Sequence, residues 1–208
     1  MTIQRTVLVI AGSAGGDVTY QQQLQQDRDM AYNILLEHSG ATFPSLSQFP
    51  AKLDGILLEL ESPHNRGLQL LRQLQEQTSA PVIVVDGGDT KVAVQAFRNG
   101  AADYLVKNQA TPDDVRLAMR TAIENAELKR ELQRSQEAFY TSVENMLDCF
   151  GTFSAMRDES GRIVDFRIDY LNAAACESNQ MPKAMQIGRA LCELLPAHRE
   201  TGLFDEYC

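Results

Sequence analysis

The sequence predicts an α/β fold with a doubly wound parallel sheet, joined through a long helix to a smaller α+β segment. Three observations predict it. Five short apolar runs alternate with helical segments, a helix signal without glycine or proline follows, and strand-like alternation begins near residue 150. The five runs are Thr6–Ile10, Tyr32–Glu37, Leu53–Leu60, Ala80–Val85 and Asp103–Lys107.

The run that ends at Leu60 is the centre of the predicted sheet. Ile56, Leu57 and Leu58 form a nearly unbroken apolar stretch, which is typical of a parallel strand buried on both faces. Glu59 stands at the carboxyl end of this strand. Open α/β sheets bind ligands at that end, so Glu59 marks the expected site.

The first strand ends in a glycine-rich stretch, residues 11–16. Its spacing matches neither common phosphate-binding glycine motif, so a flexible connection is favoured over a phosphate loop. Asp17 or Thr19 is expected to cap a helix over Gln21–Arg28. After the second strand, a short helix is expected near Ser45–Phe49.

The later helices have clearer signals. Arg66–Gln77 has helical spacing, and Asp89 or Thr90 begins the next helix, with Gly100 just past its end. Thr111-Pro112-Asp113-Asp114 is a strong helix start, because a capping threonine precedes proline at the first helical position and acids at the positive end of the dipole.

The doubly wound order 2-1-3-4-5 places the third strand between the first and the fourth. Glu59, Asp86 at the end of the fourth strand, and Lys107 then share one rim of the sheet, beside the Ala11-Gly12 turn. These groups could form an acid–base cluster, but a structural ion-pair network is favoured.

The last helix signal runs from Asp113 to about Cys149. Beyond its first turns a 4-3 spacing can be followed, which favours a dimeric coiled coil around residues 118–146. Nearly half of the positions are polar, so a single amphipathic helix packed on the next domain remains the alternative. The positions are Ala118, Thr121, Asn125, Leu128, Leu132, Ser135, Phe139, Ser142 and Met146.

The chain after residue 149 has the character of an α+β segment. Phe150–Arg157 is expected to be a strand, followed by a hairpin turn. In Val164–Tyr170 the alternation predicts an apolar face and a polar face. Short helices follow, broken at proline and glycine residues. A two-stranded hairpin is marginal alone, so this segment needs further support.

Composition narrows the classes of protein. The net charge of −9 argues against a nucleic-acid surface, and no apolar run approaches the roughly 20 residues that span a membrane. The N-terminus has no signal-peptide pattern. Four widely spaced cysteines, Cys149, Cys176, Cys192 and Cys208, are expected to be reduced thiols in a cytoplasmic protein.

The region from about Arg5 to Glu124 resembles the receiver domain of two-component signalling, which has a flavodoxin-like fold. In that family two acids after the first strand hold Mg²⁺, and an aspartate ending the third strand accepts a phosphoryl group. Tyr104 and Lys107 match the family's aromatic residue and lysine. The resemblance is carried by Leu57–Leu60, Ser62-Pro63, Gly67-Leu68, Pro81–Val85 and Gly100–Lys107.

Four residues depart from the family's pattern. Ala11 and Gly12 replace the metal-binding acids, and Glu59 replaces the phosphoacceptor. Asp86 replaces a threonine or serine and would repel a phosphoryl group. Since Mg²⁺ is bound through carboxylates together with substrate phosphate, we expect no metal, no cofactor and no phosphorylation of the usual kind.

Glu59 carries its charge one methylene further out than aspartate would. One hypothesis is that Glu59 and Lys107 form a fixed ion pair that holds the domain in one state. The alternative is that Glu59 is only an acid at a strand end, with the switching logic lost.

The segment from about Glu144 resembles the front part of a PAS sensor domain. The expected domains are a receiver over 1–124, a helical linker over 125–143 and a partial PAS domain over 144–208, which is part of a longer product or is completed by another chain. This layout resembles the N-terminal part of cyanobacterial hybrid sensory histidine kinases. The resemblance is carried by Asp148–Gly151, Asp158–Phe166, Tyr170–Ala174 and Gly188–Pro196.

The favoured function is a non-catalytic signalling module that works by contact with a histidine kinase or with C-terminal output domains. A conventional phosphoaccepting regulator is the alternative. An enzyme is not expected, because no nucleotide motif occurs and His38 and His64 lie at a strand end and in a loop. A PAS sensor with haem or flavin would need His198 or a cysteine as its ligand, which is not favoured.

Overall fold

The computed structural model describes residues 4–12, 16–38, 49–50, 52–62 and 64–208. Its internal contacts divide the chain into two compact units, Met1–Glu131 and Leu132–Cys208. The first carries a five-stranded sheet and the second a two-stranded sheet. Within the described ranges, no helix has the length and apolar character that crossing a membrane requires.

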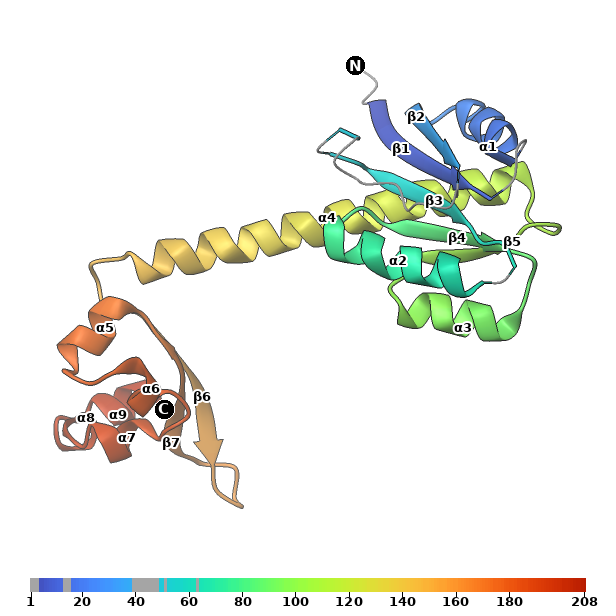
Figure 1. The fold of residues 1–208 in the computed structure, drawn as a ribbon. Helices are drawn as coiled ribbons and strands as arrows, with labels where there is room; N and C mark the ends of the chain where they lie inside the picture. Colours follow the sequence, from blue (N-terminus) through green and yellow to red (C-terminus); the bar gives the residue numbers. More distant parts are fainter. Residues whose placement is uncertain (1–3, 13–15, 39–48, 51, 63) are drawn as a thin grey trace. The chain divides into compact units, whose positions relative to one another are not determined.

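The sheet of the first unit has the predicted order, β2-β1-β3-β4-β5, with every neighbouring pair parallel (Figure 1). Side chains of β3 alternate between two hydrophobic clusters, Ile56 and Leu58 on one face and Leu57 on the other. The central strand is therefore buried on both faces, as predicted. The strands are β1 (Gln4–Ala11), β2 (Ala31–His38), β3 (Gly55–Glu59), β4 (Val82–Asp86) and β5 (Asp103–Val106).

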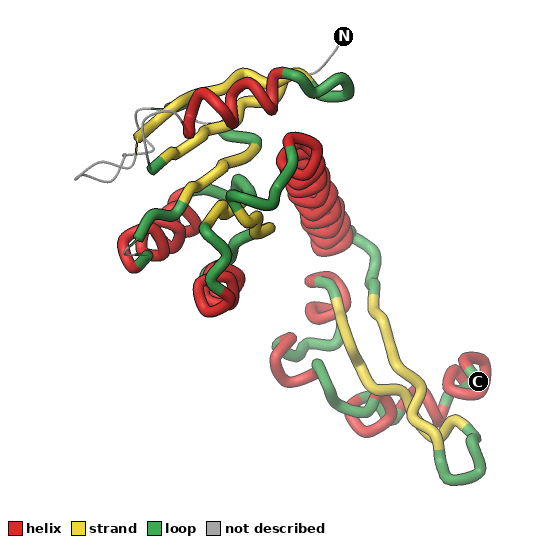
Figure 2. Tube along the Cα trace, turned by 90° about the vertical axis from the view of Figure 1, so that its right-hand side faces the viewer, coloured by secondary structure: helices red, strands yellow, loops and turns green. Residues whose placement is uncertain are grey.

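Helices cover both faces of this sheet (Figure 2). Side chains of α2 (Asn65–Gln77) and α3 (Thr90–Arg98) fill one cluster, and those of α1 (Gly16–Gln25) and the first turns of α4 (Pro112–Glu144) fill the other. Asp89 caps α3 by accepting a 2.8 Å bond from the Lys91 amide, as expected. Each face is closed by apolar side chains at helical spacing.

The boundaries of α1 differ from the predicted range, Gln21–Arg28. The helix begins five residues earlier and ends at Gln25. The Asp27 carboxylate accepts bonds from the amides of Asp29 (2.9 Å) and Met30 (3.3 Å). This local turn competes with a further helical turn and ends the helix. The helix expected near Ser45–Phe49 falls almost wholly outside the described residues.

The helix α4 spans 33 residues but stops at Glu144, five residues before the predicted end. The Val143 carbonyl accepts a bond from the Asn172 side chain at 3.1 Å, so a distant residue takes over one of the last helical acceptors. At the other end, Ala118 is buried against the sheet. It was expected in the coiled-coil seam, and its burial removes it from that pattern.

The second unit contains an antiparallel pair, β6 (Gly151–Arg157) and β7 (Ile163–Leu171), around a small core. The clean alternation predicted for β7 is wrong in part, because the register shifts between Met156 and Arg157, which leaves Val164 without a partner in β6, and again between Thr152 and Phe153. Ile168 and Leu171 are both buried, whereas Val164 is exposed. A bulge re-aims side chains in this way. The helices are α5 (Ala173–Ser178), α6 (Lys183–Gln186), α7 (Leu191–Leu194), α8 (Ala197–Glu200) and α9 (Leu203–Tyr207).

Candidate functional site

The predicted site residues meet at one rim of the first unit, because parallel strands end at the same edge of a sheet. Ala11 is the last residue of β1, Glu59 the last of β3, and Asp86 the last of β4. Tyr104 lies within β5, and Lys107 directly follows that strand. The sequence therefore placed these residues on the correct edge.

Glu59 is a buried carboxylate, with a residue exposure of 2%. Its Oε1 atom forms an ion pair with the Lys107 ammonium, as the ion-pair hypothesis expects. Its Oε2 atom accepts a bond from the Gly12 amide at 3.3 Å. Tyr20 of α1 also lies within reach of its charge, since burial and then the Glu59 charge raise the pKa of Tyr20.

Asp86 is more deeply enclosed, with an exposure of 1%. Its Oδ2 atom accepts bonds from the Tyr104 hydroxyl (2.7 Å) and from the Gly88 (3.2 Å) and Asp89 (3.3 Å) amides. Burial alone would raise the pKa of Asp86, but the hydrogen bonds from Tyr104 and the backbone lower it below its ordinary value. The site thus holds a second fixed anion.

His64 is a member of this site that sequence reasoning assigned only to a loop. Its Nε2 atom lies 2.8 Å from Asp86 Oδ1, and its backbone caps α2. Three side chains from separate segments, Tyr104, Asp86 and His64, are therefore joined in a chain. The sequence could have indicated His64 as a site residue, because it follows Glu59 by five residues, in the loop at the functional rim.

The rim does not fit the Mg²⁺ that receivers of this fold bind. Ala11 and Gly12 carry no side-chain oxygen, and the Glu59 carboxylate already contacts a lysine and an amide. A Cβ atom at Gly12 would overlap the exposed Glu61 side chain, which would have to move to admit a larger residue there. Over the part of the chain that the structure describes, no three His, Cys, Asp or Glu side chains form a metal-binding group.

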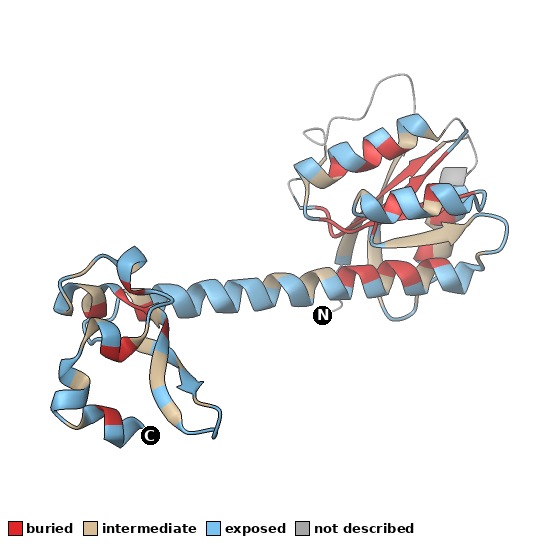
Figure 3. Ribbon diagram, turned by 90° about the horizontal axis from the view of Figure 1, so that it is seen from below, coloured by how far each residue is buried: buried red, intermediate tan, exposed pale blue. Residues whose placement is uncertain are grey.

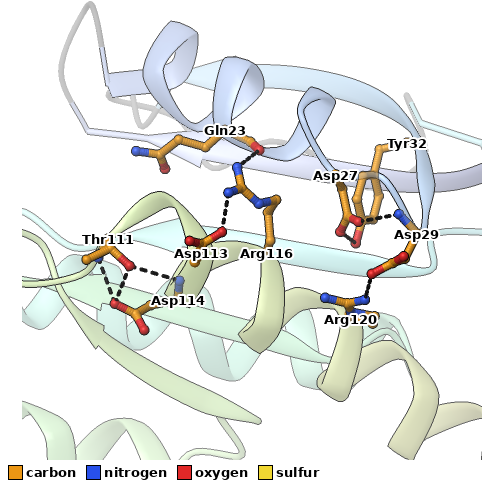
Figure 4. A network of polar contacts seen from close by, with 9 residues as sticks. All are labelled: Gln23, Asp27, Asp29, Tyr32, Thr111, Asp113, Asp114, Arg116 and Arg120. Carbon is orange, nitrogen blue, oxygen red and sulfur yellow. Dashed lines mark hydrogen bonds and ion pairs between the residues drawn. The ribbon is translucent and has the colours of Figure 1, made fainter.

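A polar network at the α1, β2 and α4 contact positions the long helix (Figure 4). Arg116 donates to the Gln23 carbonyl at 3.1 Å and forms an ion pair with Asp113. Arg120 forms an ion pair with Asp29. None of these contacts was predicted, because each joins segments about 90 residues apart in the sequence or depends on the exact helix phase.

The second unit has its own buried polar centre, Asn172, which is fully buried. Its amide donates to the carbonyls of Val143 (3.1 Å) and Asp148 (2.9 Å). Its carbonyl oxygen accepts from the amides of Phe150 (2.9 Å) and Ala175 (3.0 Å). One side chain thereby ties the end of α4 to the beginnings of β6 and α5.

The four cysteines are free thiols, and they differ in burial, with Cys192 buried and Cys149 exposed. Burial raises the pKa of Cys192, with the Asp165 charge adding to the effect. His198 Nδ1 lies 3.2 Å from the Leu195 carbonyl. These side chains were the candidate haem or flavin ligands.

Comparison with known proteins gives relatives for part of the chain. No protein-family model matches it. The C4-dicarboxylate transport transcriptional regulatory protein DctD of Pseudomonas aeruginosa is 40% identical over 90 residues, which are 39% of this chain and 20% of DctD. The transcriptional regulatory protein ResD of Bacillus subtilis is 34% identical over 98 residues, 47% of this chain and 38% of ResD. This chain therefore spans about a fifth of the length of DctD.

Solved structures match the fold of the first unit. A response regulator receiver domain protein from Clostridium thermocellum has a TM-score of 0.50 at 23% identity, covering 60% of this chain and 98% of that one. NtrX from Brucella abortus, solved in complex with ADP, has a TM-score of 0.54 at 22% identity. The match covers 72% of this chain and 32% of the NtrX chain. The first unit therefore has the fold of response regulator receiver domains.

Proposed function

We propose that this protein is a signalling module of a two-component system that acts through protein contacts, without catalysis and without phosphorylation of its receiver in the usual way. The observation that carries the proposal is the Glu59 carboxylate, buried and paired with Lys107 beside a turn that lacks acids. The Glu59 carboxylate thus lies at the position where other receivers gain a phosphoryl group.

Charge explains why phosphoryl transfer is disfavoured here. Phosphoryl transfer needs a metal ion to neutralise the developing charge, and carboxylates hold that ion. The rim instead contains two carboxylates: Glu59 is paired with the Lys107 ammonium, and Asp86 contacts the imidazole of His64. A phosphoryl group would add roughly −1.5 to −2 charge beside Asp86.

The output is proposed to pass through contacts. The face of the receiver that carries Tyr104 contacts a histidine kinase or output domains. The helix α4 connects the receiver to a PAS-like segment. Two copies associate through the exposed part of α4, between Thr121 and Ser142. The names of the relatives, transcriptional regulatory proteins and response regulators such as ArlR of Staphylococcus aureus, support a place in signalling.

The proposal predicts that association does not depend on a phosphodonor. The mass of the protein in solution is measured by sedimentation, with and without Mg²⁺ and acetyl phosphate. We expect the same monomer–dimer equilibrium in both conditions. A dimer that forms only with both reagents present would contradict the proposal and favour a conventional phosphoaccepting receiver.

A further inference from the structure

One line along α4 is left open to solvent over six turns. Its residues recur at alternating spacings of four and three, and all are exposed. Figure 3 shows the helix beyond its first turns mostly in the colour of exposed residues. In the first turns of the helix, the buried residues Met119 and Ile123 lie on a different side. Ala118, which continues the line toward the N-terminus, is buried against the sheet, so the open line begins at Thr121. The open line consists of Thr121, Asn125, Leu128, Leu132, Ser135, Phe139 and Ser142.

Large apolar side chains occupy the middle of this line. Leu128, Leu132 and Phe139 are exposed by 64%, 61% and 56%. The spacing is that of the a and d positions of a heptad repeat, in which a second helix covers the line. Thr121, Leu128, Ser135 and Ser142 take d positions, and Asn125, Leu132 and Phe139 take a positions.

We propose that the occupant of this line is α4 of a second copy of the chain, running parallel and in register. This inference rests on the homodimer of the proposed function and adds its orientation and its register. Two independent features of the helix carry it, the charges beside the line and the polar residue within it.

The charges beside the line are complementary only in the parallel arrangement. In a parallel coiled coil, a residue at position g faces the residue five places further on in the partner, at position e. Glu124 is at g and Lys129 is at e, and both are exposed. The pair would form twice in a two-fold dimer. In an antiparallel pair g faces g and e faces e, so the Glu124–Lys129 pair would not form.

Asn125 fixes the register. A single asparagine at an a position specifies two-stranded pairing in register, because each amide bonds to its counterpart at the same level. A parallel pairing shifted by one heptad would set the amide against the apolar side chain of Leu132, where an unpaired polar group costs free energy. Asn125 is exposed in the single chain, so its amide is available.

A charge exchange tests the orientation in the full chain. Glu124→Lys places like charges opposite each other at two sites, and we expect the dimer dissociation constant to rise about fivefold or more. Lys129→Glu added to the same chain should restore it to within about twofold. Glu137→Lys, which changes the net charge equally on the outer side of the helix, should leave it unchanged.

Cysteine cross-linking tests the register. In a background of Cys149→Ser and Cys208→Ser, each of Thr121→Cys, Ser135→Cys and Ser142→Cys should form a disulfide between identical copies. Glu137→Cys, on the outer side, should not.

The outcomes separate this inference from the proposed function. A protein that is monomeric at all concentrations overturns both the homodimer and this arrangement. A dimer in which Thr121→Cys reacts in mixtures with a cysteine at an a position, such as Phe139→Cys, but does not react with itself, is antiparallel and overturns only this inference. If the wild type is a dimer but the charge exchange does not restore association, the result also overturns only this inference.

Discussion

The Tyr104 hydroxyl donates a 2.7 Å hydrogen bond to the Asp86 carboxylate, which is buried at the end of β4. Burial and this bond raise the pKa of Tyr104 above its ordinary value, so the hydroxyl stays protonated and remains a donor. The His64 side chain contacts the other oxygen of Asp86. A carboxylate of the protein itself therefore holds the aromatic residue of β5 in place.

Removing the hydroxyl should destabilise the first unit. Tyr104→Phe leaves a buried, charged acceptor without one of its donors, and hydrogen bonds to charged groups contribute about 1.5–3 kcal/mol. We expect a loss of that size in the free energy of unfolding measured in urea. Tyr207→Phe, at an exposed tyrosine, is the control and should cost less than about 0.5 kcal/mol. If both variants lose the same free energy of unfolding, the hydrogen bond from Tyr104 to Asp86 does not stabilise the first unit.

The stability that Asp86 contributes should depend on pH in one direction. Its pKa is lowered in the folded protein from an ordinary value of 3.8, so the folded state binds its proton less readily than the unfolded state. The contribution is complete above about pH 5 and declines as the pH falls below about 4. The stability difference from Asp86→Asn should therefore shrink at low pH.

This comparison is made in a His64→Gln background, so that titration of the imidazole does not enter. Urea unfolding of the two variants is followed from pH 7 to pH 3. A difference that stays constant over this range would show that Asp86 is not an anion stabilised by its hydrogen bonds.

The Glu59–Lys107 pair should matter more than a surface ion pair. Breaking a fully buried pair costs about 3–5 kcal/mol, but Lys107 is 43% exposed and water can reach the carboxylate once the lysine is gone. We expect Lys107→Ala to lower the free energy of unfolding by about 1–3 kcal/mol. Adding Glu59→Gln should recover part of this loss, because the buried charge is then removed.

Lys91→Ala, at an exposed lysine of α3, is the matched control for this series. If Lys107→Ala costs no more than Lys91→Ala, the pair is an incidental surface contact and Glu59 is only an acid at a strand end.

Asn172 should be the most sensitive polar residue of the second unit. Asn172→Ala leaves four buried or partly buried backbone groups without the partner they have in the structure, and we expect a loss of about 2–4 kcal/mol. Near-ultraviolet circular dichroism during heating follows the tertiary packing. Asn145→Ala, at an exposed asparagine near the end of α4, is the control. A similar transition for both variants would contradict the account.

The sequence predicted those features that depend on local pattern. The apolar runs around Leu57 and Ile83 define buried parallel strands, and β3 ends at Glu59, one residue before the end of its run. Since strand order follows from the alternation with helices, the positions of Glu59 and Lys107 on one rim were predictable as well.

Features that depend on distant contacts were not predictable. The end of α4 is set by Asn172, and the pairing of His64 with Asp86 depends on how the loop after β3 lies. The bulge in β7 changes which face each residue occupies, so alternation alone placed Val164 wrongly. In each case a contact made by the folded chain outweighs the local pattern.

The central claim is that the rim of the first unit does not accept a phosphoryl group. The full chain is incubated with Mg²⁺ and acetyl phosphate, under conditions that label a phosphoaccepting receiver, and its intact mass is measured. We predict an unchanged mass. A stable gain of one phosphoryl group that is absent from Glu59→Gln would contradict the account.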